Sequence, residues 1–363
     1  MRILFVITSM RTGGAERLVA DMILEMKHLG HKVDIFLFDG TETPLLRELE
    51  KHISISFGAK GALQMWNPFH FFKLRKLIRS GNYDIVHSHN SPAQILTSLI
   101  SKNPHTKFVT TEHNTLTNRR KFTFLRWIDP FFYKVYDHVV CVSKKTRNNL
   151  LENVAINPEK VTVITNGIDI SKFSPDSNYT LSKPVPKINP GDKIILMVAS
   201  FRKQKDHATL VHAMKYLPRN YRLWLAGGWI GKKKYEKLVD LLELNDRIEF
   251  LGERNDMPAV LRISDIVVLS TFYEGFGLSI VEGMAMGKPC IASDIVDLRD
   301  TVMGAGILFP PGDEEALAET IRQCVENKTI YSAISKKCVQ RASQFDIRKT
   351  VNDHISLYQN LCQ

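Results

Sequence analysis

The chain has 363 residues, more than one hydrophobic core usually supports, so we expect two domains. Apolar residues make up 44% of the chain and charged residues 24%, a globular composition that excludes intrinsic disorder. The five cysteines fit no metal or disulfide spacing, which favours a reducing compartment. No apolar run approaches the ~18 residues of a membrane-spanning helix, and the N-terminal run 3–7 is too short for a signal peptide. We therefore expect a cytoplasmic protein, with membrane contact only at the inner face of the cell membrane.

The net charge of +11 is concentrated in the first half of the chain. Residues 1–180 hold 24 Lys and Arg against 16 Asp and Glu, whereas the remainder holds 25 against 22. A basic surface of this kind favours an anionic partner, either nucleic acid, a membrane surface or a phosphorylated substrate. No nucleic-acid-binding module is recognisable, so we expect no nucleic acid partner.

Short β-rich runs alternate with helical stretches along the chain. The candidate strands are residues 2–8, 32–38, 84–89, 107–112 and 137–143, then 193–200, 221–227, 247–252, 265–270 and 288–293. This alternation predicts two doubly wound α/β domains with parallel sheets. Four prolines between residues 171 and 192 predict a linker, which separates domain 1–170 from domain 193–344. Ligands of such sheets bind beyond the carboxyl ends of the strands.

The loop after the first candidate strand contains Gly13 and Gly14. Paired glycines before a helix let a phosphate approach the backbone, although a generic tight turn fits equally well. The dinucleotide-binding fingerprint is absent, because Ala15, Glu16 and Arg17 follow.

Three histidines lie at candidate strand ends. His87 and His89 would share one face of a strand, but no third metal ligand is near, so hydrogen-bonded core histidines are favoured. His113 follows its strand and is the better candidate for substrate contact. No Asp-x-Asp pair is present, so we expect a metal-independent site without cofactor.

Two stretches interleave aromatic and basic residues, residues 66–79 and 119–134. In the first, Phe71, Leu74 and Ile78 share a helical face. Such a helix can lie on an anionic bilayer, although a core-facing helix with a solvated basic side is an equal alternative.

Charged side chains also mark two loops of the second half. Arg202, Lys203 and Lys205 follow strand 193–200, where a diphosphate would need positive charge, although a charge run is often only a solvated face. Glu274 and Glu282 flank a Gly-Phe-Gly turn. A helix starting near Gly277 would offer its N–H groups to an anion, with carboxylates for ribose and hexose hydroxyls. The pattern therefore predicts a cradle for a nucleotide diphosphate joined to a sugar.

Taken together, these segments resemble the retaining glycosyltransferases of family four. The matching segments are Gly13–Glu16, DIVHSH (84–89), TTEHN (110–114), CVSKKTRNNL (141–150), TNGID (165–169), VASFRKQKDH (198–207), LGERNDMP (251–258) and EGFGLSIVEGMAMGKPCIASD (274–294). They span nearly the whole chain in the family's order. The resemblance implies the GT-B architecture, in which two Rossmann-like domains face across a cleft. It also implies that the last helix, residues 345–363, returns to the N-terminal, acceptor-binding domain.

The resemblance also assigns roles. Glu282 would bind the ribose, Glu274 would lie beside the donor sugar, Lys205 would bind phosphate, and His113 would be the active-site histidine of the N-terminal domain. The implied nucleotide-sugar-binding residues are Gly13, Gly14, Arg202, Lys205, Phe276, Gly277, Leu278, Ser279 and Glu282. The family's arginine before this loop is replaced by Ser200, so Arg202 is expected to supply its charge.

The resemblance implies transfer of a hexosyl or N-acetylhexosaminyl group, with retention, by a front-face route assisted by the leaving phosphate. We expect a UDP-sugar donor, because UDP is the commonest donor nucleotide in such enzymes. The basic, aromatic first half favours a lipid-linked saccharide acceptor in bacterial surface polysaccharide assembly. The alternative is a GT-B nucleotide-sugar epimerase or hydrolase.

Overall fold

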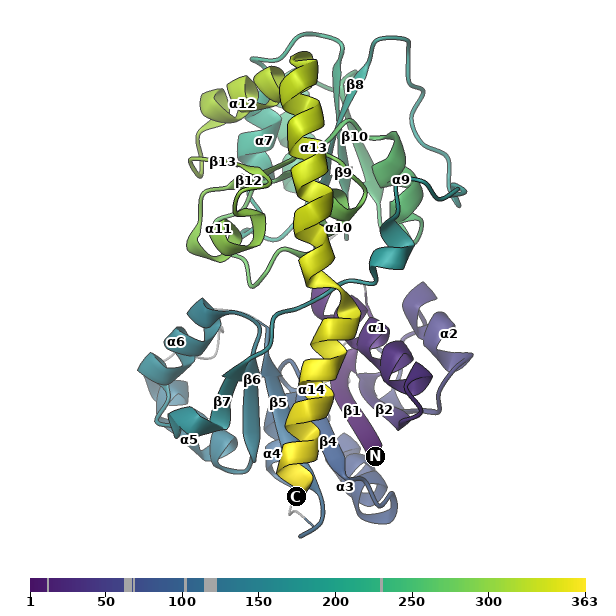
Figure 1. Ribbon diagram of the computed structural model, residues 1–363, viewed down its shortest axis with the longest axis vertical. Coiled ribbons are helices and arrows are strands. Elements are labelled where there is room, and N and C mark those ends of the chain that lie inside the picture. Colours follow the sequence, from purple (N-terminus) through teal and green to yellow (C-terminus); the bar gives the residue numbers. More distant parts are fainter. Residues whose placement is uncertain (12, 62–66, 68, 101–102, 114–122, 229–230) are drawn as a thin grey trace. The chain divides into compact units, whose positions relative to one another are not determined.

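The computed structural model describes the chain except residues 12, 62–66, 68, 101–102, 114–122 and 229–230, and it describes only the backbone of residues 123–128. The described chain forms two compact units (Figure 1). The first unit contains residues 1–167 and 347–363, and the second contains residues 168–346. The predicted linker 171–192 therefore lies within the second unit. Hydrogen bonds hold it there, from Ser182 N to Asp256 Oδ2 (2.6 Å) and from Arg254 Nη1 to the carbonyl of Pro184 (3.0 Å).

In the described part of the first unit, seven parallel strands form one sheet in the order β3-β2-β1-β4-β5-β6-β7. The strands are β1 (Arg2–Ser9), β2 (Lys32–Asp39), β3 (Ile55–Ala59), β4 (Ile85–His89), β5 (Lys107–Glu112), β6 (His138–Cys141) and β7 (Val161–Val163). Residues 3–7 of β1 are fully buried, because helices cover both faces of a parallel sheet. The order reverses between β1 and β4, and such a switch point is where doubly wound sheets bind ligands.

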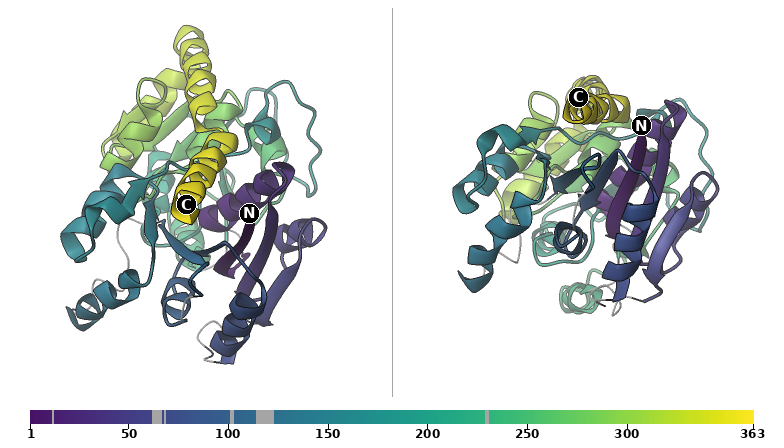
Figure 2. Two further views of the ribbon diagram at one scale, coloured as in Figure 1. Left: turned by 60° about the horizontal axis from the view of Figure 1, so that its bottom comes forward. Right: turned by 90° about the horizontal axis from the view of Figure 1, so that it is seen from below.

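Helices cover both faces of this sheet (Figure 2). They are α1 (Gly14–His28), α2 (Pro44–Glu50), α3 (Phe69–Ser80), α4 (Ala93–Ser98), α5 (Thr123–Lys134), α6 (Lys144–Asn153) and α14 (Ile347–Cys362). The C-terminal helix α14 packs against α1, and Thr350 Oγ1 donates a hydrogen bond to the carbonyl of Thr165 (2.9 Å). The last helix of the chain is thus part of the first unit.

The described part of the second unit repeats the topology with six parallel strands, in the order β10-β9-β8-β11-β12-β13. The strands are β8 (Lys193–Val198), β9 (Tyr221–Ala226), β10 (Ile248–Gly252), β11 (Ile266–Leu269), β12 (Cys290–Ser293) and β13 (Ile307–Phe309). The helices are α7 (His207–Ala213), α8 (Lys232–Leu241), α9 (Met257–Ile263), α10 (Leu278–Ala285), α11 (Val296–Val302), α12 (Glu314–Glu326) and α13 (Lys328–Ala342). Here the switch point lies between β8 and β11.

All ten predicted strands are confirmed, and the prediction of two doubly wound parallel sheets is confirmed with them. Three edge strands were missed. Of these, β7 and β13 have only three residues each, too few to show a pattern, and β3 contains Gly58 and the exposed Phe57.

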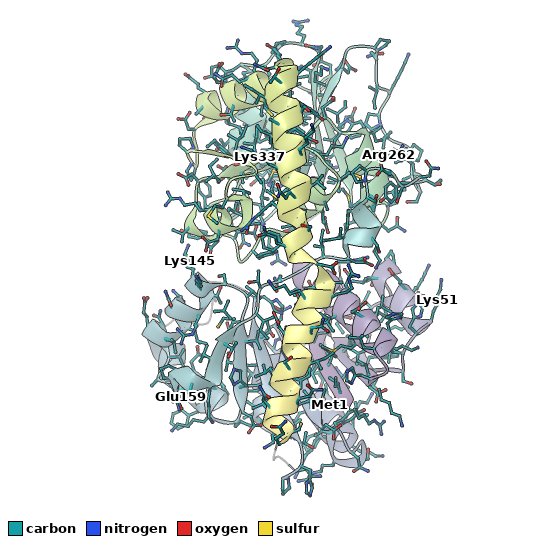
Figure 3. All side chains as sticks on the ribbon, in the orientation of Figure 1. Met1, Lys51, Lys145, Glu159, Arg262 and Lys337 are labelled. Atoms are coloured by element: carbon teal, nitrogen blue, oxygen red, sulfur yellow. The ribbon has the colours of Figure 1, made fainter. Side chains whose placement is uncertain are left out.

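Charged side chains lie on the outside of both units. Figure 3 labels Lys51, Glu159, Arg262 and Lys337, all of which are exposed. Within the described residues, no helix is both long enough and apolar enough to span a bilayer.

The core of the first unit contains a group of buried histidines, namely His87, His89 and His354. Burial lowers the pKa of His354 to about 4 and the pKa values of His87 and His89 well below the usual range. The unfolded chain therefore binds more protons than the native state below about pH 6.5. Stability contributed by these neutral rings is complete above that pH and is lost as the pH falls toward 4.

We expect His354→Gln to reduce this acid sensitivity. Between pH 7 and pH 4.5 the wild-type free energy of unfolding should fall by about 2 kcal/mol more than that of the variant. Urea unfolding followed by circular dichroism at both pH values measures the difference. The exposed His52 supplies the control, since His52→Gln should lose as much stability as the wild type. Equal losses in all three proteins would contradict the prediction.

Candidate functional site

Two loops meet at the switch point of the second unit. One follows β8 (residues 199–206) and the other follows β11 (residues 270–277). Backbone hydrogen bonds join them, from Asp206 N to the carbonyl of Ser270 (3.0 Å) and from Phe272 N to the carbonyl of Gln204 (2.9 Å). Thr271 Oγ1 donates a further bond to the carbonyl of Gln204 (2.8 Å). The relative position of the two loops is therefore fixed by main-chain geometry.

Lys205 and Glu274 form an ion pair across these two loops. Their side chains are only 13% and 16% exposed. Burial, with the charge of Arg202 acting in the same direction, lowers the pKa of Lys205 to about 7. Contact with the Glu274 carboxylate opposes this shift, because an opposite charge favours the ammonium form. The pair provides a cation and an acceptor oxygen at one point of the sheet edge.

The buried His207 supports the loop that carries Lys205. Its Nδ1–H donates to the carbonyl of Lys205 (2.9 Å), and its ring stacks on Phe201 with the ring centres 4.5 Å apart. His207 is not among the residues predicted from sequence, although its place directly after Asp206, the N-cap of α7, is a signal for a helix start.

Helix α10 begins at Leu278 with Gly277 as its N-cap, as the sequence predicted. Gly277 has a φ of +86°, in the left-handed region that favours glycine. The N–H groups of Leu278 and Ser279 have no carbonyl partner within the helix, so the helix start favours an anion. Glu282 is half-buried and lies one turn further along, on the face of Leu278 and Ser279. Phe276, in the middle of the Gly-Phe-Gly turn, is buried and packs edge-on against Phe345.

The candidate residues of the first unit lie at the carboxyl ends of β1, β4 and β5. Gly13 is the N-cap of α1, and the Glu16 carboxylate lies so near that a Cβ on residue 13 would come within 2.2 Å of its Oε2. Asn90, at the end of β4, has a φ of +64° and its Nδ2 lies 3.5 Å from Glu16 Oε1. His113, at the end of β5, is half-buried, and its Nε2 lies 2.9 Å from Nδ1 of His89.

The structure therefore groups the predicted residues in two sets. Lys205, Glu274, residues 276–279 and Glu282 lie at the switch edge of the second sheet, with Arg202 exposed on the same loop. Gly13, Gly14 and His113 lie at the corresponding edge of the first sheet. His89 and Asn90 belong to the second set but were not assigned to the site from sequence. Their position at the end of β4, next to β1 at the switch point of the sheet, was the sequence signal that could have assigned them to the site.

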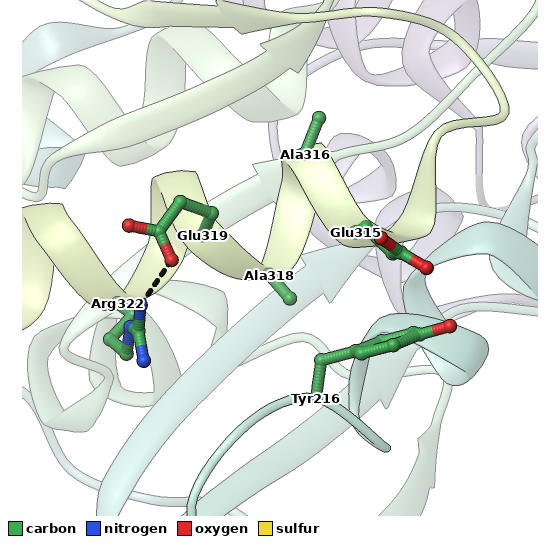
Figure 4. A pocket seen from close by; sticks show the side chains of 6 residues that line it. All are labelled: Tyr216, Glu315, Ala316, Ala318, Glu319 and Arg322. Carbon is green, nitrogen blue, oxygen red and sulfur yellow. Dashed lines mark hydrogen bonds and ion pairs between the residues drawn. The ribbon is translucent and has the colours of Figure 1, made fainter.

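No three His, Cys, Asp or Glu side chains of the described residues are arranged to hold a metal ion. A pocket of about 450 Å³ lies elsewhere on the second unit, beside α12 (Figure 4). It is lined by Tyr216, Glu315, Ala316, Ala318, Glu319 and Arg322. None of these residues belongs to the two joined loops, so the pocket is separate from the candidate site.

Family models match both halves of the chain. Residues 12–172 match Glycosyltransferase Family 4, and residues 179–344 match Glycosyl transferases group 1. The chain is a family 4 glycosyltransferase. The α1,3-galactosyltransferase of Escherichia coli that uses UDP-Gal and GlcNAc-diphosphoundecaprenol is 27% identical to this glycosyltransferase, over 93% of this chain and 88% of the relative. A Campylobacter jejuni N-acetylgalactosaminyltransferase, whose name gives a diphospho-undecaprenol-linked acceptor, is 24% identical over 96% of both chains.

Solved structures confirm the GT-B fold of this glycosyltransferase. Anabaena HepE, determined in complex with UDP and glucose, aligns with a TM-score of 0.83, 22% identity and 99% coverage of each chain. Sucrose-phosphate synthase from Thermosynechococcus elongatus aligns with a TM-score of 0.82 and 19% identity, over 99% of this chain and 98% of the other.

Gly277→Ala should destabilise the enzyme more than Gly304→Ala. Both glycines have positive φ, which costs an alanine about 1 kcal/mol. A Cβ at residue 277 would also approach Leu298 Cδ2 to 2.7 Å, whereas nothing lies within 4 Å of one at residue 304. We expect losses in the free energy of unfolding of about 2 and about 1 kcal/mol, respectively. Urea unfolding measures both, and equal losses would contradict the expected crowding at the start of α10.

Proposed function

We propose that this glycosyltransferase moves a sugar from UDP to a lipid-linked saccharide with retention of anomeric configuration, in bacterial surface polysaccharide synthesis. The observation that carries the proposal is the Lys205–Glu274 pair beside the N-terminus of α10. A largely buried cation beside helix amides that have no carbonyl partner within the helix suits a diphosphate, and carboxylates suit sugar hydroxyls.

In the proposed complex, Glu282 accepts hydrogen bonds from the ribose, while Lys205 and the amides of residues 276–279 hold the diphosphate. Lys205 then exchanges the Glu274 carboxylate for phosphate, which releases Glu274 toward the sugar. Arg202 is exposed on the same loop and adds positive charge near the leaving group. These groups stabilise the negative charge that develops on the departing phosphate.

His113 and the loop of Gly13 and Gly14 contact the sugar and the acceptor in this proposal. No second carboxylate is assigned as an enzymic nucleophile. Retention therefore follows the front-face route, in which the leaving phosphate takes the acceptor's proton as the sugar passes through an oxocarbenium-like state. The sugar's anomeric carbon exchanges its bond to phosphate for a bond to the acceptor oxygen.

Two sequence relatives and one solved structure support the choice of donor and acceptor. The Escherichia coli relative is named for UDP-Gal and an undecaprenol-linked acceptor, and the Campylobacter jejuni relative for another undecaprenol-linked acceptor. HepE, similar in fold, has also been determined with UDP-glucose.

A nucleotide-sugar epimerase or hydrolase could use the same donor site. Incubation without acceptor separates the two, because conversion of the donor to a new nucleotide sugar would favour an epimerase.

Lys205→Ala and Glu282→Ala should each lower kcat/KM for the donor by about 100-fold, because each removes a charge-assisted contact to the nucleotide. The assay is consumption of UDP-, GDP- and ADP-sugars by purified enzyme, and we expect UDP-sugars to be used. Lys203 is the matched control, since it lies exposed on the same loop, and Lys203→Ala should stay within twofold of wild type. Wild-type turnover in the Lys205 or Glu282 variant would overturn the assigned donor site.

A surface on the first unit supports a membrane-held acceptor. We define the aromatic–basic face as the exposed residues Phe69, Phe72, Lys76 and Arg79 of α3. Phe69 is 73% exposed and Phe72 is 59% exposed. Leu74 and Ile78, on the other side of α3, are buried and Phe71 packs against the same core, so the predicted apolar face of this helix faces the core, as in the second of the two alternatives. Much of the predicted stretch 119–134, and Trp66 and Pro68 of the other, lie outside the described residues or have no described side chain.

Exposed aromatics beside lysine and arginine suit the interface of an anionic bilayer. We therefore expect the enzyme to float with phosphatidylglycerol vesicles at low salt. The double variant Phe69→Ser/Phe72→Ser should bind them about tenfold more weakly, because it removes the apolar part of the contact. Leu241→Ser is the matched control, as Leu241 is 79% exposed but lies on the second unit. No flotation of the wild type, or an equal loss in both variants, would count against membrane contact through this face.

A further inference from the structure

Four histidines of the first unit form a continuous cluster, which we call the histidine cluster. It consists of His87 and His89 on β4, His113 after β5, and His354 on α14. The ring centres of His87 and His89 are 4.1 Å apart, those of His89 and His113 are 5.2 Å apart, and those of His87 and His354 are 5.6 Å apart. The cluster thus connects the proposed active-site histidine to the C-terminal helix.

One hydrogen bond in the cluster determines where His113 carries its proton. His113 Nε2 and His89 Nδ1 are 2.9 Å apart, so one of these nitrogens donates and the other accepts. Burial and the neighbouring histidines lower the pKa of His89 well below its usual range, and burial lowers the pKa of His113 to about 4. Each ring is therefore neutral at physiological pH and carries a single N–H.

The other nitrogen of His89 decides the direction of that bond. His89 Nε2 is buried and has no hydrogen-bond partner among the described residues. If Nε2 carried the proton, a buried N–H donor would be left unsatisfied, which costs more than an unsatisfied acceptor. The proton of His89 therefore belongs on Nδ1, which donates to Nε2 of His113. His113 must then carry its own proton on Nδ1.

Packing holds the His89 ring in this orientation. It stacks on Phe5, with ring centres 5.6 Å apart and an interplanar angle of 14°. Its neighbour His87 is held from both sides, because Nδ1 lies 2.6 Å from the Tyr358 hydroxyl and Nε2 lies 2.7 Å from Thr111 Oγ1. His89 is fully buried between these groups, so its ring cannot turn over without disturbing the core.

We propose that His89 is a positioning residue that fixes His113 as the neutral Nδ1–H tautomer, so that His113 donates a hydrogen bond to an oxygen of the bound donor. The part of this inference that concerns the donor rests on the proposed function. In this role His113 stabilises the donor in the reactive position and does not act as a base. The rest of the histidine cluster supports His89 from α14 and β5.

Nuclear magnetic resonance of ¹⁵N-histidine-labelled enzyme tests the tautomer without any substrate. Two-bond ¹H–¹⁵N correlation spectra distinguish the two neutral tautomers, and His113→Asn assigns the His113 signals. We expect a protonated-type shift at Nδ1 of His113 and an unprotonated-type shift at Nε2, unchanged from pH 6 to pH 8. An Nε2–H tautomer in the wild-type enzyme would overturn the proposal.

Variants of His89 test the consequence for catalysis. His89→Phe keeps a ring but removes the donor, so the His113 signals should shift to the Nε2–H form and kcat/KM should fall by about 10 to 100-fold. His89→Asn places an amide N–H near the lost Nδ1–H and should restore both the tautomer and most of the activity. His138→Phe is the control, because it removes a buried histidine ring of the same unit that lies outside the histidine cluster and bonds to Thr162 instead.

The outcomes separate this inference from the proposed function. If the wild-type tautomer is as expected but His113→Asn keeps full activity, the proposed role of His113 fails and the positioning by His89 stands. If His113→Asn is inactive but His89→Phe leaves the tautomer unchanged, the positioning role fails and the proposed function stands.

Discussion

The parallel pairing of β8 with β11 is the constraint on which the candidate donor site depends. The two strands are joined in register at Ile195 and Ile266, although about 70 residues of chain separate them. Because parallel strands end at the same sheet edge, their following loops must meet there. Backbone hydrogen bonds from Asp206 N to the carbonyl of Ser270 and from Phe272 N to the carbonyl of Gln204 then join these loops. Lys205 and Glu274 are therefore brought together by main-chain geometry, and their own attraction only completes the arrangement.

The Lys205–Glu274 pair also offsets the cost of burying a lysine. A largely buried ammonium group is costly unless an opposite charge or hydrogen-bond acceptors surround it. Glu274 provides that charge within the protein, as a diphosphate would when bound. In the proposed function, the same carboxylate would serve two partners in turn, Lys205 without donor and sugar hydroxyls with donor. Such an exchange would leave neither charge buried alone in either state.

The sequence predicted more of the fold than of the site, for physical reasons. Apolar runs such as residues 3–7 reveal central strands, because they are buried on both faces, whereas β7 and β13 are too short to leave a pattern. The Gly-Phe-Gly turn correctly located the start of α10, since a left-handed residue before a helix has a local signature. The hydrogen bond between His89 and His113 has no local sequence signature, because strand pairing brings these two residues together from 24 positions apart. The prolines of 171–192 suggested a linker, but contacts distant in sequence determine where that segment packs.

The two units share a topology but differ in the chemistry of their switch edges. In the second unit that edge carries Lys205, Arg202 and Glu274, all charged groups. In the first it carries Gly13, Asn90 and His113 with the Glu16 carboxylate beside them, and burial keeps the histidine neutral. Part of the basic excess of the first half, Lys76 and Arg79, is exposed on α3. We accordingly expect phosphate recognition in the second unit, while the first unit contributes the neutral His113 near its sheet edge and positive charge on the surface of α3. That division suits the proposed reaction, in which the leaving group is anionic and the acceptor is held at a negatively charged membrane.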